Sequence, residues 1–154
     1  MNILQKLLVP TAGSAFIVGT VGAAQALTLV APNAQTNVEG NSSAYVPFND
    51  AAIANRYQQV YAASEFNSLS EPQLITGISF RPDADAGNPF TSNLPSIQIN
   101  LSTTNSAPDG LSPMFTENIG ANNTVVYNGS LPLTSADTGS AVGPKEFDIN
   151  IDLQ

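Results

Sequence analysis

The last ten residues, Lys145–Gln154, read KEFDINIDLQ, and apolar and polar side chains alternate along them. Phe147, Ile149, Ile151 and Leu153 fall on one side, and acidic or amide side chains fall on the other. This period of two predicts a half-buried strand that begins at Lys145. Because an open apolar edge invites pairing with other chains, we expect the strand to lie inside a sheet. A neighbour in sequence beyond Gln154 would cover it, and without that neighbour the chain is expected to self-associate through this edge.

Other stretches alternate in the same way. Gln73–Arg81 (QLITGISFR) and Ser96–Thr103 (SIQINLST) are predicted strands, the second with its isoleucines facing inward. Leu27–Ala31 is predicted to be a short edge strand. Asn123–Leu133 (NTVVYNGSLPL) contains Asn128-Gly129, the strongest hairpin signal in the chain, although one long strand with a glycine bulge also fits.

The connecting segments are rich in Pro, Gly and Asn. Pro82–Pro95 is predicted to be a loop throughout, Pro108-Asp109-Gly110 a turn, and Ser112-Pro113 the start of a short helical turn. Ala51–Phe66 is ambiguous, because its apolar residues fit both helical spacing and a strand. Five or six short strands separated by long loops predict an all-β fold, a β-sandwich with Greek-key or jelly-roll connections, formed by residues 27–154 as one domain.

Composition restricts the possible functions. The 154 residues include no Cys, His or Trp, so a disulfide framework, a thiolate nucleophile, most nucleophilic triads and nearly all structural zinc sites are excluded. Twelve acidic residues oppose four basic ones. The net negative charge would repel phosphate backbones and anionic lipid headgroups, so neither nucleic acid nor a membrane surface is an expected partner.

The first 26 residues resemble an export signal. Lys6 precedes a long apolar run that closes on Ala24-Gln25-Ala26, the small-x-small pattern that signal peptidase requires. A retained membrane anchor is the alternative, but Pro10 and several glycines shorten the uninterrupted apolar core. Residues 1–26 are therefore predicted to be a signal helix cleaved after Ala26, and the rest to be secreted or bound to the cell envelope.

The sequence contains three candidate sites. Asp83 and Asp85 resemble the first ligands of a calcium loop, but Gly87 stands where a third ligand should be, so a solvated loop is the preferred interpretation and no cofactor is expected. Tyr57 and Tyr61 lie on one face in either conformation of their segment. They suit a platform for sugar rings or simple packing. A carboxylate pair for polysaccharide hydrolysis is numerically possible, but the sequence shows no pairing.

Several motifs occur in an order that resembles a known group. They are RYQQVYAASEF, ITGISFRPDA, IQINLSTT, SAPDGLS, IGANNTVVYNG, SADTG and GPKEFDINI. Together they resemble the N-terminal half of exported bacterial proteins, common in cyanobacteria, that carry PEP-CTERM-type sorting tails. The resemblance implies an all-β fold, and further β-structure and a sorting tail after the last strand. It also implies an extended conformation for Arg56–Phe66, so the ambiguous segment is predicted to be a strand. It transfers no catalytic or ligand residues, so the site assignments rest on the residues alone.

The expected function is that of a non-enzymatic structural or adhesive module outside the cell or at the envelope. Extracellular polysaccharide or envelope components are the expected partners. The alternatives are a glycan- or calcium-binding module of the extracellular matrix and a carboxylate-dependent polysaccharide hydrolase.

Overall fold

The computed structural model of the chain describes residues 27–40, 55–85 and 87–154. In these residues β-structure dominates and helix is confined to three 3₁₀ turns. The strands are β1 (Gly77–Phe80), β2 (Phe90–Leu101), β3 (Thr124–Ser135) and β4 (Ile149–Asp152). The 3₁₀ turns are η1 (Asn33–Gln35), η2 (Ala63–Phe66) and η3 (Phe115–Asn118). The predicted signal segment, with Ala24 and Ala26, lies outside the described residues, as does the first part of the ambiguous segment.

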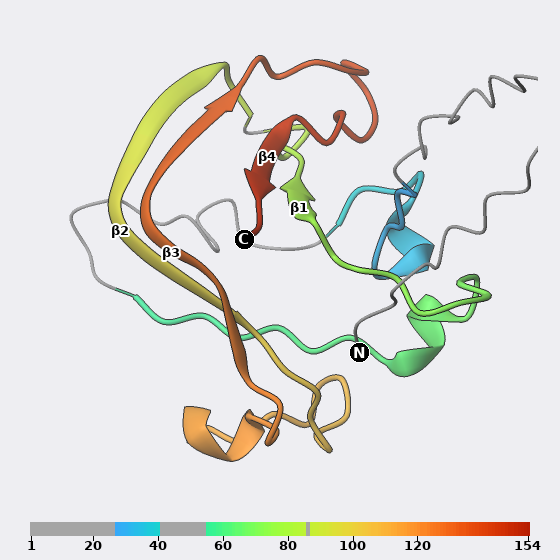
Figure 1. Cartoon of the computed structure of the whole chain (residues 1–154). Helices are drawn as coiled ribbons and strands as arrows, with labels where there is room; N and C mark the ends of the chain where they lie inside the picture. Colours follow the sequence, from blue (N-terminus) through green and yellow to red (C-terminus); the bar gives the residue numbers. More distant parts are fainter. Residues whose placement is uncertain (1–26, 41–54, 86) are drawn as a thin grey trace, which may run out of the picture.

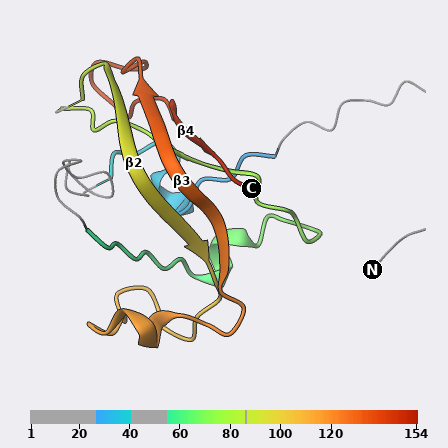
Figure 2. The same cartoon turned by 60° about the vertical axis from the view of Figure 1, so that its left-hand side comes forward.

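The four strands form two antiparallel sheets of two strands each, β2–β3 and β1–β4. β2 and β3 make a long curved ribbon, and β1 and β4 lie on its concave side (Figure 1). Turning the molecule shows β4 alongside β3 (Figure 2), and a backbone hydrogen bond from Gln154 N–H to Val126 O joins the two. The all-β prediction is therefore confirmed at the level of two small sheets.

A small apolar core holds the two sheets together. Leu94, Leu131 and Leu133 of the ribbon are buried against Ile149 and Ile151 of β4. Leu94 and Leu131 stand opposite each other in the ladder, as expected when one face of an antiparallel pair is buried. The predicted alternation of the terminal strand is confirmed from Ile149 to Asp152, because Ile149 and Ile151 are buried whereas the residues between and after them are exposed. It is wrong for Phe147, which was placed on the buried side but is 39% exposed.

A polar contact closes one end of this core. The Ser135 hydroxyl, buried at the end of β3, donates to a carboxylate oxygen of Asp148 at 2.8 Å, and the Ala136 N–H donates to the other at 2.9 Å. Asp148 directly precedes β4. One carboxylate therefore joins the end of β3 to the start of β4. The ladder begins at Ile149 rather than at the predicted Lys145. Lys145 forms only an isolated bridge with Gly139.

The ribbon corrects two predictions. β2 begins at Phe90, so the second half of the predicted loop Pro82–Pro95 is strand. Pro95 lies at an irregularity between Leu94 and Ile97, where a bulged residue needs no ladder donor. Asn128-Gly129 is not a hairpin turn: β3 runs straight through it, opposite that irregularity, with Gly129 at φ 155°. The alternative of one long strand is the correct one, but the extra residue lies in β2 between Leu94 and Ile97 and not at Gly129.

The N-terminal described segment is not a strand. Leu27–Ala31 pairs with no described strand, and the segment is held instead by side-chain bonds. The Asn33 amide donates to the carbonyl of Glu65 at 2.9 Å, and Arg81 donates to the carbonyl of Val38. Without a neighbouring strand the short apolar stretch cannot form a ladder, so the edge-strand prediction is wrong.

The remaining local predictions are mostly confirmed. Asp109 takes φ 61° and Gly110 N–H donates to Ala107 O at 2.9 Å, so the Pro-Asp-Gly turn forms. The short helical turn forms as η3, slightly later than predicted. Within the predicted strand Gln73–Arg81, only the residues of β1 pair in a ladder. Thr76, which directly precedes β1, still accepts the Leu153 N–H at its carbonyl oxygen at 3.0 Å.

Candidate functional site

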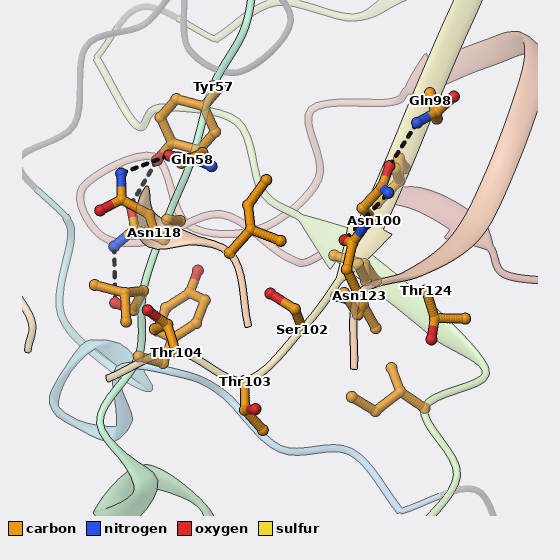
Figure 3. Close-up of a pocket in the computed structure, with 18 of the residues that line it drawn as sticks. Tyr57, Gln58, Gln98, Asn100, Ser102, Thr103, Thr104, Asn118, Asn123 and Thr124 are labelled. Carbon is orange, nitrogen blue, oxygen red and sulfur yellow. Dashed lines mark hydrogen bonds between the residues drawn. The ribbon is translucent and has the colours of Figure 1, made fainter. Parts of the chain in front are cut away.

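One feature with the shape of a site is an open cleft of about 1450 Å³. Its walls are the extended segment 55–61 and the second half of β2, and residues 102–104 lie between them (Figure 3). Figure 2 shows segment 55–62 passing by the β2–β3 ribbon and the loop between β2 and β3 at one end of that ribbon. The cleft borders the small core, because core residue Ile151 also lines it, as do Ile97 and Ile99, which pack against the core.

The first wall is the described part of the ambiguous segment. Residues 55–62 are neither helix nor paired strand, and η2 begins only at Ala63. Residues 55–62 run as an extended trace (Figure 1), but the predicted strand is not formed. The extended conformation that the resemblance implied is wrong for Ala63–Phe66, which form η2. The Gln58 side chain explains the extended conformation, because its Nε2 donates to Phe115 O at 3.0 Å and its Oε1 accepts from Asn118 Nδ2 at 2.9 Å. Side chains, not a ladder, hold this wall in place.

Asn118 is the centre of that attachment. It is only 6% exposed, and besides Gln58 its amide contacts Ser112 twice. Oδ1 accepts the Ser112 N–H at 2.8 Å, and Nδ2 donates to Ser112 O at 2.9 Å. Asparagine supplies both a donor and an acceptor group, which this position uses in full. No periodicity signals such a residue, and sequence reasoning missed it.

The second wall carries a row of amides. Gln98 Nε2 donates to Asn100 Oδ1 at 2.8 Å, and Asn100 Nδ2 donates to Asn123 Oδ1 at 3.2 Å. All three side chains are exposed. Behind them, Asn122 Oδ1 accepts both the N–H and the hydroxyl of Thr103 at 2.9 Å, which fixes the floor of the cleft.

The two tyrosines singled out from the sequence both line the cleft. Tyr57 is 45% exposed and Tyr61 is 41% exposed, so neither is a core residue. Partial burial raises the pKa of Tyr57 above its ordinary value of 10.0. Burial raises the pKa of Tyr61 as well, with a further contribution from the neighbouring Tyr57. The structure therefore brings the two phenols near each other on one surface.

The charges are distributed unevenly around this site. Among the described residues that line the cleft, Arg56 is the only charged one and no carboxylate is present. Arg56 itself lies over the ring of Phe115, with its guanidinium carbon 4.8 Å from the ring centroid. General acid–base chemistry of the carboxylate type would therefore need a surface other than the described lining of this cleft.

The predicted calcium ligands lie elsewhere. Asp83 Oδ1 accepts the Asp85 N–H at 2.9 Å, and Gly87 N–H donates to Asp83 O at 2.8 Å, so the carboxylate caps its own turn. In the described part of the chain, no three acidic residues come together as a metal site would require. One further carboxylate approaches this turn, because a Cβ added to Gly87 would lie 2.5 Å from Asp137 Oδ1 and 2.6 Å from Asp83 O.

Comparison with known proteins adds no relative. No family model, curated protein or solved structure matches the chain. Within the described ranges, no helix has the length and apolarity needed to cross a membrane.

Proposed function

We propose that this chain is an exported, non-enzymatic module that acts as a structural or adhesive component outside the cell or at its envelope. The observation that carries the proposal is the lining of the cleft. It combines exposed tyrosines, amides and hydroxyls with a larger apolar surface from residues such as Ile75, Ile78 and Phe80. No carboxylate is among its described residues, although the chain contains twelve acidic residues. Such a surface suits adhesion by hydrogen bonding and ring contacts.

The proposed architecture is a β-sandwich in which β1–β4 and β2–β3 are parts of facing sheets. Supporting this, the two sheets pack through apolar side chains that come from alternate positions of β3 and β4. The resemblance to exported PEP-CTERM-type proteins supports the same fold and an extracellular role. No sorting tail is needed for export itself, which rests on the proposed signal segment.

Export is tested by the N-terminus of the protein recovered outside the cytoplasm. Edman sequencing is expected to begin LTLVAPN, at Leu27. Replacing both Ala24 and Ala26 with tyrosine should prevent this cleavage, because the shallow pockets of signal peptidase admit only small side chains. Recovery of the uncleaved chain from cells expressing the unaltered sequence would contradict the proposed processing.

Adhesion is tested with the exopolysaccharide matrix of the producing bacterium. The purified protein is expected to be retained on this matrix and to release no reducing sugar from it. Two controls report nonspecific retention. One is the same protein unfolded in urea and diluted just before application, and the other is an unrelated acidic protein of similar charge. Release of reducing sugar would replace the proposal with a hydrolase, and passage through the matrix without delay would remove adhesion.

A further inference from the structure

The cleft is sized for an extended ligand. Its volume of about 1450 Å³ exceeds the roughly 300–1,000 Å³ of ordinary small-molecule sites. It is also open and lined along the length of a strand, since consecutive residues from Ser96 to Thr104 all contribute. A flexible small molecule would leave most of this surface wet, whereas a polymer could follow it.

The charges select an uncharged occupant. The chain has a net charge of −8, so an anionic polymer meets repulsion as it approaches. The described lining contains one cation, Arg56, which already lies over Phe115. A cationic ligand finds no carboxylate there to pair with. An uncharged polymer meets neither repulsion nor the cost of leaving its charge unpaired.

The polar groups of the lining match hydroxyl-rich ligands. In the row Gln98–Asn100–Asn123, each bond uses one donor and one acceptor, so hydrogen-bonding capacity remains on every exposed amide. Hydroxyl groups of Ser102, Thr103 and Thr104 lie between this row and the opposite wall (Figure 3). Hydroxyls and amides both donate and accept, as sugar hydroxyls do.

The opposite wall supplies aromatic faces. Tyr57 and Tyr61 are each more than a third exposed, and the Tyr57 hydroxyl donates to Gln59 Oε1 at 2.6 Å, which restrains its ring. A pyranose ring presents an apolar C–H face and polar edges. A surface with phenol rings on one wall and amides on the other can contact both.

We propose that the cleft binds a neutral polysaccharide chain, with Tyr57 and Tyr61 contacting sugar faces and the Gln98–Asn100–Asn123 row contacting sugar hydroxyls. This assignment rests on the proposed adhesive function and gives it a ligand class and a site. The competing occupant is a second copy of this chain, whose apolar strand would cover the isoleucines of β2.

The test uses native affinity electrophoresis of the purified full chain. Gels contain galactomannan or mixed-linkage β-glucan as neutral polymers, or polygalacturonate as the anionic one. Retardation is expected in at least one neutral gel and not in polygalacturonate. The double variant Tyr57→Ala/Tyr61→Ala is expected to bind about 5- to 150-fold more weakly, since each aromatic contact contributes roughly 0.5–1.5 kcal/mol.

Two matched variants separate binding from folding. Phe147→Ala removes an aromatic ring of similar exposure, 39%, that does not line the cleft, and should leave retardation unchanged. Tyr57→Phe/Tyr61→Phe keeps both rings and should retain most of the affinity. A neutral-polymer complex that survives the double alanine variant, or is lost equally in Phe147→Ala, would overturn the assignment of the site.

The outcomes also separate this inference from the adhesive function. Retention by the producer's matrix without retardation in any neutral gel refutes the ligand class and leaves adhesion standing. Retention by neither refutes both. Retardation only by polygalacturonate refutes the charge argument. Light scattering that shows a dimer, which the double alanine variant dissociates, would assign the cleft to a second copy instead.

Discussion

Replacing Asn118 with alanine tests whether side-chain hydrogen bonds, rather than a β-ladder, hold the first wall of the cleft. The Asn118 amide makes three well-formed bonds, two with the backbone of Ser112 and one with Gln58 Oε1, at 2.8–2.9 Å. Each such bond contributes about 1 kcal/mol net, so the variant should lose about 3 kcal/mol in the free energy of unfolding. At 6% exposure, little water reaches these partners to replace the lost amide.

The free energy of unfolding is measured by urea denaturation followed by far-ultraviolet circular dichroism, with the slope compared between variants. Asn150→Ala is the matched control, because Asn150 is exposed and accepts a bond from Ser79 Oγ at 2.7 Å that water can replace. This control should change stability by less than about 0.5 kcal/mol. Hydrogen exchange gives a local reading, because the Ser112 amide should exchange faster in Asn118→Ala and not in Asn150→Ala.

Equal losses of stability in the two alanine variants would refute the reasoning about Asn118. So would an unchanged exchange rate at Ser112. A loss confined to local exchange, with global unfolding unaffected, would mean that the wall opens independently of the core, and would contradict the predicted magnitude.

Three further predictions concern the core, one backbone position and the phenols. Leu133→Ala should cost about 2–5 kcal/mol because Leu133 is 2% exposed, whereas Leu74→Ala, at 85% exposure, should be nearly neutral by the same urea assay. Gly139→Ala should destabilise the chain by more than about 1 kcal/mol, because φ is 115° and an added Cβ would lie 2.9 Å from a backbone nitrogen; a melting temperature equal to that of the unaltered protein would contradict this. The raised pKa values of Tyr57 and Tyr61 mean that folding favours the neutral phenols, so their contribution to stability is complete below pH 10 and declines as the pH rises through the folded pKa. Absorbance titration at alkaline pH should show delayed ionisation that both Tyr→Phe changes remove, and ionisation at the unfolded pKa would count against it.

The strands were predictable where one face is buried. The alternation in β4 and in the second half of β2 identified the inward isoleucines. In a half-buried strand successive side chains point to opposite faces, so every second residue must be apolar. Phe90–Pro95 was missed because local prolines and polar residues suggest a loop. Its strand conformation comes from pairing with residues 131–135, which local sequence does not encode.

The hairpin turn predicted at Asn128-Gly129 was wrong for the same reason. The dipeptide favours a hairpin turn, but reversal there would separate Leu131 and Leu133 from their pairing with β2. The buried position of both leucines shows which requirement prevails. Tertiary burial of two leucine side chains outweighs a local turn preference of this kind.

The candidate site was predictable only in part. The shared face of Tyr57 and Tyr61 follows from their spacing, and both do line the cleft. The amide row and the Asn118 contacts depend on residues that lie far apart in sequence, such as Asn118 and Gln58, 60 positions apart. Amide side chains have no characteristic spacing, so only the fold brings these groups together.

The ribbon itself explains why a binding site lies beside such a small core. The inward apolar positions of β2 continue across the irregularity at Pro95, but Leu94 before it is buried whereas Ile97, Ile99 and Leu101 after it are only partly buried. Leu94 belongs to the core with Ile149 and Ile151 of β4, whereas Ile97 and Ile99 pack against the margin of that core and also line the cleft. Any occupant of the cleft therefore binds to folded protein at apolar surface that the chain's described residues leave partly wet. By mass action such a ligand must stabilise the fold, so the neutral polymer that retards the protein should also raise its melting temperature, and the double tyrosine variant should lose both effects together.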